Sequence, residues 1–306
     1  MSIFEAIILG LIQGIAEFLP ISSSGHLALA QKLFGLNDIP LLFDVMLHLA
    51  TLAAVVLYFR KKIIRLFAIF FRWILRKPVE EKKQTEFSVL IQDIDLLTGT
   101  ETLGRKTILA VIFASLVTGI IGIFTSKIIP DMPLKVTCAG FLVTASLLIF
   151  SSIWEKKHEK TIIDRQPANH DSKNTNISGL LNENGISIPQ SLFIGFMQGI
   201  GTLPGISRSG STIAGAQFTG VNRSAAGEFS FIVSIPAILG AFLLEAKDLG
   251  QVSSEIGILP LIFGCLSAFA WGFLSLSFLM RLIRRGKLEF FACYLIPLGI
   301  AGLIWL

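Results

Sequence analysis

Two segments of this chain carry the same polar string in the middle of otherwise apolar sequence. The first copy spans residues 13–26 and reads QGIAEFLPISSSGH, and the second spans 198–211 and reads QGIGTLPGISRSGS. With one deletion and one insertion, five positions coincide: Gln13 with Gln198, Pro20 with Pro204, Ser22 with Ser207, Ser24 with Ser209 and Gly25 with Gly210. Agreement at this density is not expected by chance. Each copy therefore marks a place where an apolar helix is interrupted by proline, glycine and serine.

The rest of the chain is apolar enough to lie in a lipid bilayer. Of its 306 residues 53% are apolar and only 15% are charged, and the mean hydropathy is +0.72. Runs long enough to cross a hydrocarbon core of about 30 Å occur at six places. They are residues 43–60, 107–125, 135–154, 227–246, 256–280 and 289–306. The sequence predicts an all-α integral membrane protein with six spanning helices.

The two repeat regions, residues 3–36 and 188–220, are apolar as well but are broken after about 17 residues. Irregular backbone at membrane depth occurs only where protein buries it or water reaches it. We therefore expect each region to be a re-entrant helix-loop-helix hairpin, with turns at 20–25 and 204–210. The alternative is an ordinary spanning helix kinked at proline.

Basic residues indicate the orientation, because cytoplasmic loops carry an excess of Lys and Arg. They cluster after the first, third and fifth spans: Arg60, Lys61, Lys62, Arg65, Arg72, Arg76 and Lys77; Lys156, Lys157, Lys160 and Arg165; Arg281, Arg284, Arg285 and Lys287. The opposite loops, 126–134 and 247–255, hold Lys127 and Lys247 and are balanced by acidic residues. The basic cytoplasmic loops thus account for the net charge of +5, and no nucleic-acid partner is expected.

With six spans, the first hairpin enters from outside and the second from the cytoplasm, so the two halves have inverted topology. We expect a single membrane domain, with a first repeat at 1–157 and a second at 188–306. Inverted repeats bring broken segments together near the bilayer midplane, where freed backbone groups can hold a ligand. The sequence predicts one composite site made from both hairpins. A homodimer is also compatible with this sequence pattern.

Two polar stretches, 78–106 and 158–187, stand outside the repeat and are expected to be cytoplasmic loops. The first contains a short apolar run at 87–97 that could form an interfacial helix, and the second is rich in Asn, Asp and Ser and is expected to be flexible. Neither is assigned a catalytic role. Three cysteines lie within spans without metal or redox spacing, and we interpret them as small buried apolar residues: Cys138, Cys265 and Cys293.

Candidate chemistry in the first hairpin begins with Glu17, because a carboxylate in an apolar segment requires a cavity or a partner. Gln13 precedes it by one helical turn and shares its face. Their oxygens would suit Mg²⁺ or Ca²⁺, with substrate phosphate completing the coordination shell. The alternative for Glu17 is a structural ion pair with Arg208.

Hydroxyl, imidazole and guanidinium groups follow the two prolines. Ser22, Ser23, Ser24 and Gly25 can direct hydroxyls and backbone N–H groups at an anion, although serine also commonly caps a helix. His26 can act as a base, an acid or a nucleophile. In the second hairpin Arg208 can bind phosphate oxygens in bidentate fashion.

These groups together suit phosphoryl transfer. A phosphate or diphosphate carried on a lipid is the substrate that explains why such chemistry is buried in a membrane. The alternative class is a transporter, which would bind an anion at the same site without breaking it.

Both motifs resemble the two signatures of the undecaprenyl-diphosphatase family of bacitracin-resistance membrane phosphatases. The resemblance lies in Gln13-x-x-x-Glu17 followed by residues 20–26, and in residues 204–212. It continues through 43–55 and 228–231, so that mainly the two cytoplasmic loops are unmatched. In the family the first motif opens with Glu or Gln, and Gln13 leaves Glu17 as the sole carboxylate of the two motifs.

The resemblance implies a hydrolase of the plasma membrane that converts undecaprenyl diphosphate to undecaprenyl phosphate and inorganic phosphate. That activity recycles the lipid carrier for peptidoglycan synthesis, cell-wall biogenesis and cell shape, and it confers resistance to the antibiotic bacitracin. The resemblance also implies a site that opens toward the outer face, and it leaves open a second role in translocating the lipid phosphate.

By position, the resemblance implies that Glu17 and Gln13 serve the Mg²⁺ or Ca²⁺ and that Arg208 binds the diphosphate. Residues implied to bind substrate are Ser22, Ser24, Gly25, Gly205, Ser207, Ser209 and Thr212. The preferred nucleophile is Ser23 with His26 as its base, and direct attack by His26 is the rival mechanism. The catalytic set is thus Glu17, Ser23, His26 and Arg208.

Overall fold

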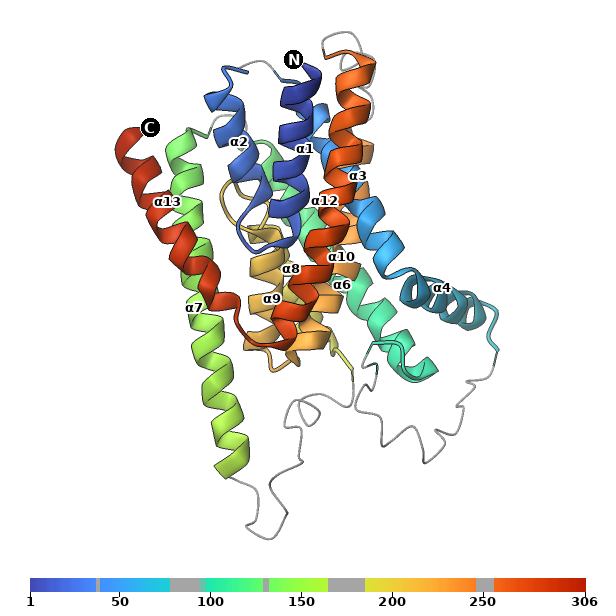
Figure 1. Cartoon of the computed structure of the whole chain (residues 1–306). Helices are drawn as coiled ribbons and strands as arrows, with labels where there is room; N and C mark the ends of the chain where they lie inside the picture. The colour runs from blue at the N-terminus through green and yellow to red at the C-terminus, as the bar shows by residue number, and fades with distance from the viewer. Residues whose placement is uncertain (37–38, 78–94, 96, 129–131, 165–184, 246–255) are drawn as a thin grey trace.

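The computed structural model describes residues 1–36, 39–77, 95, 97–128, 132–164, 185–245 and 256–306. All regular secondary structure in this part of the chain is helical (Figure 1). Its elements are α1 (Ile3–Phe18), α2 (Ser23–Leu33), α3 (Leu41–Tyr58), α4 (Arg60–Ile74), α6 (Glu101–Ser126), α7 (Leu134–Asp164), α8 (Ile188–Ile200), α9 (Arg208–Phe218), α10 (Arg223–Glu245), α12 (Ile258–Arg284), η4 (Leu288–Phe291) and α13 (Ala292–Trp305). Within these residues, six segments are long and apolar enough to cross a membrane: α3, α6, α7, α10, α12 and η4 with α13. The predicted all-α class with six spanning helices is confirmed.

Two spans are much longer than the hydropathy predicted. Helix α6 begins at Glu101 rather than 107, because Thr100 caps it by accepting a hydrogen bond from the Leu103 N–H at 3.1 Å. Helix α7 continues to Asp164 rather than 154. The polar stretches on either side are correspondingly shorter than predicted. Most of the apolar run at 87–97, and the part of 158–187 between 165 and 184, lie outside the described residues.

The repeat regions form two pairs of short helices. At a rise of about 1.5 Å per residue, α1 with 16 residues and α2 with 11 residues are both too short to cross about 30 Å of hydrocarbon. In Figure 1, α1 and α2 occupy one end of the bundle and α8 and α9 the other, and the chain turns back between the helices of each pair near mid-height. The chain thus folds back at both copies of the string. Re-entry into a bilayer and the inverted relation of the halves remain predictions.

Small residues allow α1 to pack closely against the long span α12. A Cβ atom added to Gly10 would lie 2.2 Å from the carbonyl oxygen of Gly264, and one added to Gly14 would lie 2.7 Å from that of Ala268. Close approach of small residues is a common way for helices to associate in membranes, because it maximises van der Waals contact. This contact fixes the helix that carries Gln13 and Glu17.

Substitution of Gly10 by Ala is expected to destabilise the protein by about 1–3 kcal/mol, because the added methyl group would meet backbone that cannot move aside. The measurement is the temperature at which the detergent-solubilised protein loses its monodisperse elution profile. Gly119→Ala in α6 is the matched control, since nothing lies within 4 Å of a Cβ atom there. Equal stability of the two variants would contradict the close contact.

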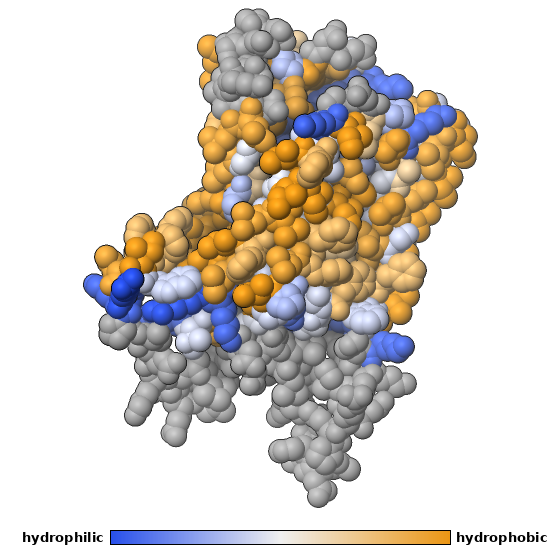
Figure 2. Space-filling view, turned by 180° about the vertical axis from the view of Figure 1, so that it is seen from behind, coloured by the Kyte–Doolittle hydropathy of each residue, from blue (hydrophilic) through white to orange (hydrophobic). Residues whose placement is uncertain are grey.

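The outer surface of the bundle is apolar over the faces of the spans. Figure 2 shows this surface from behind, with hydrophilic residues gathered mainly toward the two ends. Large apolar side chains that are more than half exposed include Leu116 of α6, Phe150 of α7 and Leu274 of α12. A surface of this kind is suited to contact with lipid and not with water.

Candidate active site

The candidate site centres on the carboxylate of Glu17, which lies near the end of α1 and is 5% exposed. Its Oε2 atom accepts hydrogen bonds from the Ser23 hydroxyl at 2.6 Å and from the Gln13 amide nitrogen at 3.0 Å. Its Oε1 atom forms an ion pair with Nη2 of Arg208, which belongs to the second hairpin. The structure therefore brings together residues from both copies of the string, as the sequence predicted.

Local backbone geometry positions Ser23. The preceding residue, Ser22, has φ 70° and ψ 96°, which is uncommon for a residue with a Cβ atom. Its hydroxyl caps α2 by accepting the Gly25 N–H at 3.4 Å, so Ser23 becomes the first residue of the helix. Backbone strain of this kind is often found at functional turns. The backbone of Ser22 therefore shapes the turn that places Ser23. Its hydroxyl also lies 3.4 Å from that of Ser24.

In the second turn the residue with a positive φ is a glycine and not a serine. Gly205 has φ +79°, and a Cβ atom there would lie 1.9 Å from the Thr137 carbonyl oxygen. Ser207 caps α9 by accepting the Gly210 N–H at 3.1 Å, and its own N–H donates to Thr144 at 2.9 Å. The turn is thereby held against α7, and Arg208 begins α9 directly beside the cap.

Arg208 has one nitrogen without a partner. While Nη2 binds Glu17, the Nη1 atom is buried and has no hydrogen-bond acceptor among the described residues. A buried unpaired donor on a charged group is costly, so its presence beside a carboxylate and a hydroxyl indicates a site for an anionic ligand.

The other predicted substrate-binding residues of the second hairpin have protein partners. Ser209 lies 3.2 Å from the Ser207 hydroxyl. Thr212 donates to the Arg208 carbonyl at 2.8 Å and contacts the hydroxyl of Ser230 in α10. These contacts hold the first turn of α9, so they can assist Arg208 by fixing its backbone.

His26 is placed differently from the sequence prediction that it serves Ser23 as a base. Its Nδ1 atom lies 2.8 Å from the Ser22 carbonyl oxygen, and its Nε2 atom lies 2.8 Å from the Tyr294 hydroxyl of α13. Because a carbonyl only accepts, Nδ1 carries a hydrogen, and in a neutral ring Nε2 accepts from Tyr294. The Ser23 hydroxyl binds Glu17 instead, and both nitrogens of His26 are occupied by other groups.

His48 is a site residue that the sequence reasoning missed. It lies on α3 with Nε2 3.4 Å from Glu17 Oε2, and its Nδ1 donates to the Asp44 carbonyl at 2.7 Å. The Asp44 carboxylate in turn accepts from Gln31 of α2 at 2.8 Å. A signal was available, since Asp44 and His48 are ionisable residues one helical turn apart inside an apolar span.

Gln13 and Glu17 meet the minimum requirement for helping to hold a divalent cation. The Gln13 Oε1 atom is buried without a hydrogen-bond partner, and it belongs to the side chain that contacts Glu17. Mg²⁺ commonly uses one or two protein oxygens together with substrate phosphate and water. Among the described residues no group of three or more His, Cys, Asp or Glu side chains could hold a metal ion. Substrate oxygens would therefore have to complete any such site.

Comparison with known proteins shows the family of this chain. The family model for bacitracin resistance protein BacA matches residues 6–301. The chain belongs to the BacA family. Relatives named undecaprenyl-diphosphatase are 44% identical in Treponema denticola, over 98% of this chain and 96% of the relative, and 35% identical in Borrelia recurrentis, over 96% of each chain. A third, in Carboxydothermus hydrogenoformans, is 33% identical over 99% of this chain and 97% of its own.

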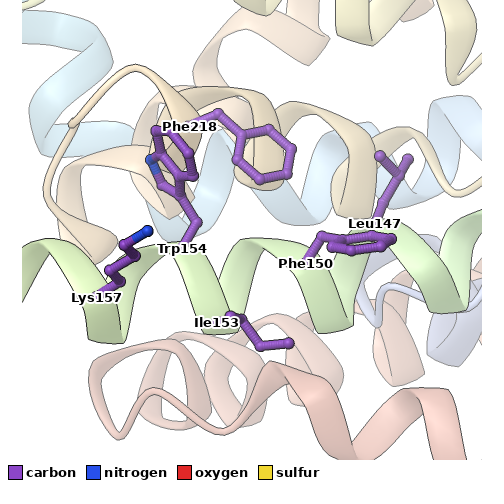
Figure 3. Close-up of a pocket in the computed structure, with 6 residues that line it drawn as sticks. All are labelled: Leu147, Phe150, Ile153, Trp154, Lys157 and Phe218. Atoms are coloured by element: carbon purple, nitrogen blue, oxygen red, sulfur yellow. The ribbon is translucent and has the colours of Figure 1, made fainter.

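This BacA family member also has a groove on its outer surface, between α7 and α9 (Figure 3). Trp154 and Phe218 approach each other near Lys157, with ring centroids 6.3 Å apart. The remaining lining residues are Leu147, Phe150 and Ile153. None of the residues around Glu17 lines this groove, so it is separate from the candidate site and belongs to the apolar outer surface.

Proposed function

We propose that this protein hydrolyses undecaprenyl diphosphate to undecaprenyl phosphate and inorganic phosphate. The observation that carries the proposal is the buried, unpaired Nη1 of Arg208 beside a serine hydroxyl that is bonded to a carboxylate. A guanidinium suits phosphate oxygens, and a carboxylate-bonded hydroxyl suits nucleophilic attack. The names of the relatives support the choice of substrate, and the apolar surface supports a substrate carried on a lipid.

In the first step, Ser23 is the nucleophile and Glu17 is its base. The hydroxyl proton moves to Glu17 Oε2, which it already contacts at 2.6 Å, while Oγ forms a bond to the distal phosphorus. The bond from that phosphorus to the bridging oxygen breaks, and its electron pair leaves with undecaprenyl phosphate. Arg208 binds the non-bridging oxygens and stabilises the charge that they carry in the transition state.

In the second step, water attacks the phosphoserine. Once the Tyr294 hydroxyl has left Nε2 of His26, one proton of the water moves to that atom, which belongs to a residue one helical turn after Ser23. Glu17 returns its proton to the Ser23 oxygen as the phosphorus–oxygen bond breaks. Inorganic phosphate is released, and His26 loses its proton to solvent. His26 as a direct nucleophile remains the rival mechanism.

We further propose that the reaction uses Mg²⁺ or Ca²⁺, held by Gln13, Glu17 and the substrate. A divalent cation would neutralise charge on the diphosphate. Removal of divalent cations with a chelator is expected to abolish phosphate release, and re-addition should restore it. Phosphate release is measured colorimetrically, and elution on gel filtration controls for integrity. Full activity after chelation would contradict the cation requirement.

In the cell, the proposed activity would take place in the plasma membrane, with the site open to the outside. The support for this orientation is that α1 and α2 lie at the end of the bundle away from the basic helix α4 (Figure 1). Recycled carrier lipid would serve peptidoglycan synthesis and cell-wall biogenesis, and removal of the diphosphate would confer resistance to bacitracin.

A second candidate function is movement of the lipid phosphate across the membrane. It is favoured by the ion pair that joins hairpins from opposite ends of the bundle, Glu17 with Arg208. The discriminating measurement uses vesicles that contain the protein and a labelled polyprenyl phosphate, which has no diphosphate bond to hydrolyse. Movement of label that the Arg208→Ala variant does not support would favour this second function, and no movement would exclude it.

A further inference from the structure

Helix α4 occupies a region whose many basic residues predict a cytoplasmic loop. Four apolar side chains recur on one face of it at intervals of three and four residues, and all are well exposed: Ile64 66%, Phe67 59%, Phe71 59% and Ile74 60%. No described part of the chain covers this face. The opposite side is attached to the protein, because Ile69 is 5% exposed.

Basic residues flank the apolar face at both ends of the helix. Arg60 and Lys61 are exposed at its start, and Arg76 and Lys77 are exposed just beyond its end. Within the described part of the chain, Lys61 and Arg76 have no acidic partner. An amphipathic helix with aromatic residues on one face and Lys or Arg beside it is typical of helices that lie in the plane of a membrane interface.

The position of α4 fits such an interface. It follows the spanning helix α3 after a single residue, and Figure 1 shows it extending sideways from the bundle at a steep angle to the spans. In Figure 2 the same projection extends to the left, with hydrophilic residues along its lower edge and apolar residues above them. The apolar side of α4 thus adjoins the lipid-facing apolar surface of the spans.

Ion pairs attach α4 to the rest of the protein. Lys62 lies 3.2 Å from Asp95 and pairs with Glu228 of α10, and Arg65 donates to the Gly99 carbonyl at 2.8 Å. Burial alone would raise the pKa of Asp95, but donation by Thr98 and the nearby Lys62 hold it below its ordinary value. The Asp95 carboxylate is therefore charged at neutral pH, and the attachment of α4 persists.

We propose that α4 lies in the headgroup layer of the cytoplasmic leaflet, with its apolar face among the acyl chains and its basic ends on the phosphates of anionic phospholipids. The charge pattern selects this occupant, because four cations and an exposed aromatic face match an anionic lipid surface. The attachment through Lys62 makes this contact an anchor for the cytoplasmic end of α10. The proposal does not depend on phosphatase activity.

The test uses the full-length protein, with its three cysteines replaced, in nanodiscs that contain phosphatidylglycerol. Single spin labels are attached at Phe67→Cys and Phe71→Cys on the apolar face and at Lys61→Cys and Lys77→Cys among the basic residues at the two ends. Electron paramagnetic resonance then compares collisions with oxygen, which dissolves in lipid, and with a water-soluble nickel chelate. We expect positions 67 and 71 to favour oxygen and positions 61 and 77 to favour nickel.

The requirement for anionic lipid is tested in the same labelled proteins. Replacing phosphatidylglycerol by phosphatidylcholine, or introducing Lys61→Gln with Arg76→Gln, is expected to raise nickel access at 67 and 71 several-fold, since each basic residue near an anionic surface changes binding by about fivefold. Lys127→Gln, in the loop after α6, is the control and should change nothing.

Three outcomes would overturn the proposal. The first is equal nickel access at all four positions, which would place α4 in water. The second is shielding of 67 and 71 from both reagents, which would show that protein covers the face. The third is identical behaviour in the two lipids. A label that disturbs folding is recognised by its elution profile and replaced by one at Ile64 or Ile74.

Discussion

Glu17→Gln and Arg208→Ala are each expected to lower phosphate release from a polyprenyl diphosphate by about 10²- to 10⁴-fold. The first substitution keeps the shape of the side chain but removes the base that contacts Ser23. The second removes the guanidinium whose Nη1 is buried without a partner. Release of phosphate by the purified, reconstituted protein is the measurement. Wild-type rates in both variants would contradict the hydrolase proposal.

The same two residues form an ion pair, so a loss of activity could also reflect damage to the fold. Removing one partner leaves the other charge buried, which is strongly destabilising, whereas removing both can be nearly neutral. The double variant Glu17→Gln with Arg208→Met separates these explanations. If the pair is only structural, the double variant should recover both stability and activity. If the residues act on substrate, it should recover stability and remain inactive.

An ion pair outside the site provides the matched control. Lys156 pairs with Glu289 at 2.9 Å, and the lysine side chain is 63% exposed. Exposed pairs contribute about 0–1 kcal/mol, so Lys156→Gln should leave phosphate release unchanged. A comparable loss of activity in this variant would show that the assay reports general disturbance of the membrane-embedded protein.

Much of the fold could be predicted from sequence because a bilayer imposes simple rules. Apolar length located all six spans, and the breaks at Pro20 and Pro204 located the two pairs of short helices. The boundaries were less accurate where a cap extends a helix, as Thr100 does for α6. Helix α4 was missed because its many basic residues lower its hydropathy, although its apolar residues recur with helical spacing.

The composition of the candidate site was predicted better than its pairing. The repeat brought Glu17 and Arg208 into one site, since both copies were expected to meet. The partner of each side chain depends on rotamers and on distant helices, which no local pattern reveals. Tyr294 is 268 positions from His26 and occupies its Nε2 atom, while the partner of Ser23 is Glu17.

Ser23→Ala is expected to lower phosphate release about 10³-fold, because it removes the proposed nucleophile and leaves the carboxylate and the guanidinium in place. Ser126→Ala is the control, since its exposed hydroxyl donates to the Ile123 carbonyl at 3.0 Å at the far end of α6. The measurement is again phosphate release in reconstituted protein. Activity near the wild-type level in Ser23→Ala would contradict the proposed mechanism.

Trapping of the intermediate distinguishes the two candidate nucleophiles. Wild-type protein is mixed with a polyprenyl diphosphate labelled at the distal phosphate and is quenched within one turnover. A phosphoserine survives acid, whereas a phosphohistidine survives alkali and is lost in acid. We expect acid-stable label on the peptide that contains Ser23, and none in Ser23→Ala. Alkali-stable label that persists in Ser23→Ala but is absent from His26→Ala would assign the attack to His26. In that case the Tyr294 hydroxyl, which lies 2.8 Å from Nε2, would have to leave that atom before each turnover.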